Sequence, residues 1–141
     1  MRAPSATLAA YFSDYERYHQ NPNNRRTHDF GIPLLVISIL GLLGKISLIY
    51  GVSIGSILWL STALWYVRVD PYYGSLMSFL TFCLLLIGSR IPSLYLSVFF
   101  LVGWALQLWG HYHFEKKSPA FTTNLRHLFV GPLWILARLL G

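Results

Sequence analysis

Long stretches without charge alternate with short polar segments along the chain, and their lengths predict membrane-spanning helices. A helix needs about 20 apolar residues to cross a hydrocarbon core of roughly 30 Å. Residues 30–67 contain Lys45 as their only charge and are long enough for two short spans, and two further uncharged runs follow. We therefore predict about four transmembrane helices, at residues 32–50, 52–67, 72–89 and 91–109.

Two amphipathic helices are predicted outside these spans, at residues 5–20 and 125–140. In the first, apolar side chains recur at helical spacing after Ser5, a residue type that caps helix N-termini. Asn-Pro-Asn-Asn at residues 21–24 is expected to end it and to open a polar loop before the first span.

The C-terminal segment 125–140 is apolar but contains charged residues and the pair Gly131-Pro132. We expect a kinked amphipathic helix on the surface here, with a fifth span or a re-entrant segment as the alternatives. The chain is thus predicted to be one all-α integral membrane domain over residues 1–141, with interfacial helices at both ends.

Composition supports the membrane class. Of the 141 residues, 55% are hydrophobic and 11% are charged, whereas soluble domains carry about a quarter charged residues. The mean hydropathy is +0.50. Cys83 is the single cysteine, which excludes a disulfide framework and a cysteine-built zinc site. The first 30 residues lack the continuous apolar segment of a cleavable signal peptide, so we expect the N-terminus to be retained.

The net charge of +6 would suggest nucleic-acid binding in a soluble protein. In so apolar a chain it instead indicates membrane orientation, and no nucleic-acid partner is expected. With four spans, Lys45 and Arg90 fall on one side and the other nine Lys and Arg residues on the opposite side. Because cytoplasmic loops are enriched in Lys and Arg, both termini are predicted to be cytoplasmic. A bacterial inner membrane and the endoplasmic reticulum membrane both fit this pattern.

All five histidines lie outside the hydrophobic cores of the predicted spans, and four of them are expected at one mouth of the bundle. His19 and His28 precede the first span, whereas His111 and His113 follow the last, so an even number of spans places them on the same face. Imidazole is a common ligand of iron and zinc, which makes a shared metal site the leading hypothesis. Glu115 lies one helical turn after His111, while His113 would point elsewhere on a helix.

Polar and basic residues accompany these histidines. Asn24 belongs to the same mouth, and the pairs Arg25-Arg26 and Lys116-Lys117 lie a few residues from the candidate ligands. These pairs either contact anionic lipid headgroups or hold the carboxylate of an acyl substrate beside the metal.

Two sequence motifs, one toward each end of the chain, resemble those of a membrane family. Residues 18–24 read Tyr-His-Gln-Asn-Pro-Asn-Asn and are followed by His28, and residues 110–116 read Gly-His-Tyr-His-Phe-Glu-Lys and are followed by Pro119-Ala120. With hydrophobic spans between them, the chain from Tyr11 to Pro132 resembles the Mpo-type 2-hydroxy fatty acid dioxygenases.

The resemblance implies an Fe(II)-dependent dioxygenase that uses O2 to shorten 2-hydroxy fatty acids by one carbon, an α-oxidation step in contact with membrane lipid. It implies that His19, His28 and His111 are iron ligands, with His113 as a less certain fourth. It further implies that Asn24 and Glu115 act in or around the site, with Glu115 as a further ligand or as a group that orients a histidine. The proposed carboxylate partners are Lys116, Arg25 and Arg26.

Two alternatives stay open at this point. One is a non-catalytic membrane protein that binds metal or anionic lipid at its cytoplasmic face. The other is a lipid enzyme that uses zinc, because the ligand types alone do not separate zinc from iron. The sequence does not fix the oligomeric state or the chain length of the substrate.

Overall fold

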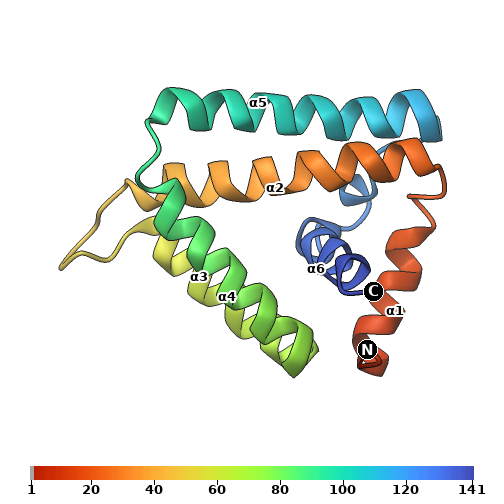
Figure 1. Ribbon diagram of the computed structural model, residues 1–141, viewed down its shortest axis with the longest axis horizontal. Coiled ribbons are helices and arrows are strands. Elements are labelled where there is room, and N and C mark those ends of the chain that lie inside the picture. The colour runs from red at the N-terminus through yellow and green to blue at the C-terminus, as the bar shows by residue number, and fades with distance from the viewer. Residues whose placement is uncertain (1) are drawn as a thin grey trace.

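The computed structural model describes residues 2–141, and within them the regular structure is entirely helical (Figure 1). In chain order the elements are α1 (Ala6–Glu16), α2 (Pro22–Gly44), α3 (Ile54–Val69), α4 (Pro71–Gly88), α5 (Ser93–Trp109), the π-helical turn η1 (Gly110–Glu115), the short 3-10 turn η2 (Ala120–Thr122) and α6 (His127–Leu139).

Two antiparallel helix pairs form the frame of the molecule. Helices α2 and α5 lie side by side, and so do α3 and α4, and the two pairs diverge from the end where α2 and α4 meet (Figure 1). Helices α1 and α6 lie in the open space between the diverging pairs. At the closed end, α2 and α4 approach so closely that a Cβ atom on Gly41 would lie 2.8 Å from the backbone of Gly88. Glycine at this crossing lets two helices pack backbone to backbone.

The helices begin where the sequence supplies caps. The side-chain oxygen of Asn21 caps α2 by accepting a hydrogen bond from the Asn23 backbone N–H, and Pro22 occupies the first helical position. Ser53 and Ser56 form a reciprocal capping box at the start of α3. Because side chains satisfy the free N–H groups of these first turns, short polar segments are enough to separate the apolar helices.

The all-helical membrane class predicted from the sequence is confirmed. Helices α2, α4 and the continuous segment Ser93–Glu115 are long and apolar enough to cross a membrane, whereas α3 is apolar but has 16 residues. At about 1.5 Å per residue, α3 is roughly 24 Å long, somewhat short of a full hydrocarbon core. Large apolar side chains such as Phe79, Leu94 and Leu101 are exposed on the outer faces, as expected for surfaces that contact lipid.

Two segments differ from the sequence-based expectation. The first apolar helix begins at Pro22 rather than at residue 32, so residues 21–24 start a helix instead of opening a polar loop. The C-terminal segment does form a helix with an internal proline, but it is not confined to the surface. Residues 130–135 of α6 are buried between α1 and the diverging helix pairs.

Asp70 fastens the N-terminal segment to the α3–α4 connection. Its carboxylate accepts hydrogen bonds from the backbone N–H groups of Ser5 at 2.8 Å and of Tyr72 and Tyr73 at 2.9 Å. Burial acts to raise the pKa of Asp70, but these backbone donors and the charge of Arg2 outweigh it and hold the pKa below its ordinary value.

We predict that Asp70→Asn destabilises the protein by about 1 kcal/mol at neutral pH, since the side chain loses its charge and one of its two acceptor oxygens. A depressed pKa contributes stability above the ordinary carboxyl pKa of about 3.9, and this contribution is lost as pH falls through the folded value. Thermal unfolding in detergent micelles at pH 7 and pH 3 should therefore show a smaller difference between the two proteins at pH 3 than at pH 7. An equal difference at both pH values would contradict this account.

Candidate metal centre

Three histidines from segments distant in the sequence meet at the end of the α2–α5 pair. His19 lies in the link between α1 and α2, His28 in the second turn of α2, and His111 in η1 at the end of α5. All three are buried, and one ring nitrogen from each lies within 4.8 Å of the others. The side chains therefore offer three nitrogen donors around one point, which is an arrangement suited to a metal ion.

Backbone carbonyls fix the orientation of two of these rings. Nδ1 of His19 lies 2.8 Å from the Tyr15 carbonyl oxygen, and Nδ1 of His28 lies 2.8 Å from the Asn24 carbonyl oxygen. Since a carbonyl oxygen only accepts, each Nδ1 carries the proton and each Nε2 keeps its lone pair. Metal-binding histidines are held in this way.

The Nε2 atoms of the three rings face one another. Nε2 of His28 lies 3.1 Å from Nε2 of His111, and Nε2 of His19 is buried without a hydrogen-bond partner within residues 2–141. A buried polar atom without a partner is costly, and a metal ion between the rings would satisfy it. Burial first and the neighbouring His28 second lower the pKa of His19 to about 2, so its imidazole stays neutral and able to bind metal at physiological pH.

The π-helical turn η1 sets the position of His111. It widens the end of α5, and Gly110 packs directly against the side chains of Asn24 and Thr27 on α2. A Cβ atom on Gly110 would clash with both side chains. A glycine directly before His111 therefore allows η1 to approach α2 closely enough for the histidines to meet.

Glu115 and Asn24 form a brace between the two ends of the chain rather than part of the nitrogen cluster. Oε1 of Glu115 accepts from the Asn21 backbone N–H at 2.7 Å and from the Asn24 amide at 3.2 Å. The same amide also donates a hydrogen bond to the backbone carbonyl of Tyr18. The backbone carbonyl of Asn24 in turn accepts a hydrogen bond from Nδ1 of His28. Glu115 is thus connected to His28 through Asn24, which is a position for orienting a ligand.

The structure does not bring the remaining predicted residues into the cluster. His113 is exposed and packs against Trp109 and Phe114. Arg25 donates from Nε to the His19 carbonyl at 2.6 Å, with its guanidinium over the ring of Trp134. Arg26 and Lys116 are exposed, and among residues 2–141 no ion pair joins Lys116 to Glu115.

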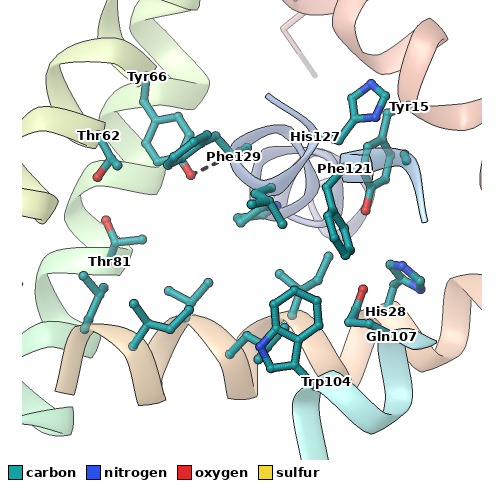
Figure 2. A pocket seen from close by; sticks show the side chains of 18 of the residues that line it. Tyr15, His28, Thr62, Tyr66, Thr81, Trp104, Gln107, Phe121, His127 and Phe129 are labelled. Carbon is teal, nitrogen blue, oxygen red and sulfur yellow. Dashed lines mark hydrogen bonds between the residues drawn. The ribbon is translucent and has the colours of Figure 1, made fainter. Parts of the chain in front are cut away.

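An apolar cavity of about 280 Å³ opens beside the three histidines and runs between the helix pairs (Figure 2). Side chains of α2, α3, α5 and α6 line most of it, and the lining residues include none of Arg25, Arg26 and Lys116. A cavity with apolar walls and one polar end suits an elongated apolar molecule with a polar head.

The sequence analysis did not single out two polar groups of this cavity. Gln107 lies one helical turn before His111 on α5, and that spacing is the signal that would have found it. His127 lines the cavity and is buried, with its Nε2 2.8 Å from a carboxylate oxygen of Asp14. No spacing rule connects Asp14 to His127, because they lie on α1 and α6 and meet only in the folded chain.

The family model described as "2-hydroxy-palmitic acid dioxygenase Mpo1-like" matches residues 5–141. A relative from Saccharomyces cerevisiae, the 2-hydroxy-palmitic acid dioxygenase MPO1, is 28% identical over 134 residues, which cover 92% of this chain and 77% of the relative. No solved structure matches. Because the family model spans nearly the whole chain, this protein belongs to the Mpo1-like 2-hydroxy fatty acid dioxygenase family.

Proposed function

We propose that this protein binds Fe(II) through His19, His28 and His111 and converts 2-hydroxy fatty acids to acids one carbon shorter, using O2. The observation that carries the proposal is the convergence of three buried imidazole nitrogens at one end of an apolar cavity. The family name supports the substrate class.

The donor set fits the proposed ion. Three neutral nitrogen donors leave coordination positions free for other ligands, as in non-haem iron sites that use O2, where two histidines and a carboxylate are the usual set. Bound Fe(II) would supply redox chemistry toward O2 and a Lewis acid for the carboxylate and hydroxyl oxygens of the substrate.

The residues of the chain prepare the site for this chemistry. The Tyr15 and Asn24 carbonyls keep the Nε2 lone pairs of His19 and His28 directed inward. The apolar walls exclude water from the bond that breaks, and they hold the acyl chain so that its first two carbons lie beside the histidines.

The reaction balances without an additional reductant. One 2-hydroxy acid and one O2 give the shortened acid, CO2 and water. The C1–C2 bond breaks, the former C2 becomes the new carboxyl carbon, and the four electrons lost by the substrate reduce O2.

The membrane setting follows from the apolar helices. We place α2, α4, α5 and the shorter apolar α3 across a bilayer, with both termini on its cytoplasmic side, because nine of the eleven Lys and Arg residues gather on that side in this four-span arrangement. A bacterial inner membrane or the endoplasmic reticulum would fit. A substrate with an acyl tail would then reach the cavity from the lipid phase.

We predict that the purified protein holds about one iron per chain and that His19→Ala, His28→Ala or His111→Ala each removes most of it, because three donors define the site. Formation of the shortened acid from a 2-hydroxy fatty acid should fall by at least about 100-fold in each variant. His113→Ala is the matched control, and it should keep both iron and activity because its ring is exposed outside the cluster.

Elemental analysis for iron and zinc, together with mass spectrometry of the product, measures these outcomes. Stoichiometric zinc with no product would favour a zinc enzyme. An iron-loaded, folded protein that makes no shortened acid from any chain length would refute the proposal.

We further predict that Glu115→Ala weakens iron binding by about 10-fold or more, because residues that orient metal ligands commonly contribute 10- to 100-fold in affinity. Glu115→Gln should restore much of this affinity, since an amide oxygen can still accept from the Asn21 N–H. Iron titration with a competing chelator measures both values. If Glu115→Gln is as damaging as loss of a ligand histidine, Glu115 binds the metal directly.

A further inference from the structure

The cavity extends away from the histidines along one side of α2. Among the α2 residues that line it, His28 is the first and Leu40 the last. At about 1.5 Å per residue, the twelve steps from His28 to Leu40 correspond to roughly 18 Å along the helix. Leu58 and Thr62 of α3 and Thr81 of α4 also line it, and Figure 2 shows Thr62 and Thr81 at the opposite end from His28.

The threonines at the far end of the cavity offer no free O–H donor. The Thr62 hydroxyl donates to the Leu58 carbonyl at 3.0 Å and that of Thr81 to the Met77 carbonyl at 2.8 Å, both within their own helices. A hydroxyl bonded to its own helix adds little attraction for a polar ligand. This end therefore suits the terminal methyl group of a hydrocarbon chain.

We propose that the cavity is the acyl-chain site and that Leu58, Thr62 and Thr81 set the length of chain the protein accepts. The choice of a 2-hydroxy acid as occupant rests on the proposed function. An extended alkyl chain advances about 1.25 Å per carbon, from C–C bonds of about 1.5 Å at about 111°, so roughly 18 Å holds about 14 carbons. With two head-group carbons beside the histidines, an acid of about 16 carbons fills the site.

The test is a profile of rates across chain lengths. Thr62→Trp places a large ring at the far end, so kcat/KM for the 16-carbon 2-hydroxy acid should fall by at least about 10-fold while the 10-carbon acid changes less than about 2-fold. Ser61→Trp adds the same ring to the exposed face of α3 and should leave the profile unchanged. Leu58→Ala, which enlarges the far end, should shift the optimum to longer chains.

An adjoining cavity of about 100 Å³ offers the alternative path for the chain. It shares Ile32, Val36, Thr81 and Pro132 with the first cavity and continues between α2, α4 and α6 past Leu84. If Leu84→Trp shifts the length profile and Thr62→Trp does not, the chain follows this second path and the proposal is wrong. A uniform loss across all lengths in Thr62→Trp, with an unchanged profile in Leu58→Ala, would also overturn it.

Binding separates this proposal from the proposed reaction. Native mass spectrometry of the metal-free protein should show tighter binding of the 16-carbon than of the 10-carbon 2-hydroxy acid, and Thr62→Trp should abolish that preference. Binding with this preference but without turnover in the iron-loaded protein would overturn the proposed function alone. Binding without any length preference would overturn the length-setting role.

A separate observation concerns Gln107. This residue is 6% exposed, its side chain lines the cavity, and Nε2 has no hydrogen-bond partner among residues 2–141. Nε2 packs against Gly31, and Figure 2 shows the amide oxygen directed toward the cavity beside His28. The Nε2 donor is thus turned away from the cavity, whereas the oxygen, at the polar end of the cavity, can accept a hydrogen bond from a donor group of a ligand.

We infer that the Gln107 amide oxygen accepts a hydrogen bond from the 2-hydroxyl group of the substrate. A hydroxyl can donate to this oxygen, whereas an ionised carboxylate cannot. Gln107 would thus distinguish a 2-hydroxy acid from the fatty acid that lacks the hydroxyl, because a site built for a hydroxyl group penalises its absence. This role also rests on the proposed function.

The test compares 2-hydroxyhexadecanoate with hexadecanoate in binding to the metal-free protein. The wild-type preference for the hydroxy acid should fall by about 10-fold in Gln107→Leu, while Gln107→Glu, which retains an acceptor oxygen, should keep it. Iron content should be unchanged in both variants. If Gln107→Leu retains the preference, or weakens the binding of both acids equally, Gln107 does not recognise the hydroxyl group.

Discussion

Antiparallel packing of α2 against α5 is the interaction on which the site depends. It brings together His28 and His111, which are 83 positions apart in the chain, with their Nε2 atoms 3.1 Å from each other. Glu115 secures the same junction by accepting from the Asn21 N–H and the Asn24 amide. Without this pairing, each end of the chain would hold only part of the donor set.

Divergence of the two helix pairs creates the space that the site uses. Helix α6 fills part of that space. Two hydrogen bonds hold it there, one donated by the Trp134 indole N–H to the Glu16 carboxylate and one donated by the Tyr66 hydroxyl to the Phe129 carbonyl. The remaining volume is the apolar cavity, whose polar end is the histidine cluster. The helices of the frame thus also line the cavity in which we propose that an acyl chain binds.

The uncharged runs made the four apolar helices predictable, and the even number of them placed the histidines on one face. The start of α2 was missed because Asn21-Pro22 interrupts one helix and caps the next, and sequence alone does not say which effect dominates. The burial of α6 was missed because an amphipathic pattern does not reveal whether lipid headgroups or protein cover its apolar face.

Within the site, the motif residues carried most of the information. The positions of the motifs were enough to name His19, His28 and His111. The spacing of a regular α-helix does not predict the π-helical turn that presents His111 and leaves His113 exposed. The contacts of Arg25 and the position of Gln107 depend on how α2, α5 and α6 pack together, which spacing along the chain does not encode.

Anomalous X-ray scattering at the iron absorption edge, from crystals of the intact protein purified with iron, tests the central claim most directly. Iron held by the three histidines gives a single strong peak in contact with Nε2 of His19, His28 and His111. A peak at His113, at Glu115 or between Asp14 and His127, or an iron-replete protein with no peak among the three histidines, would contradict this claim.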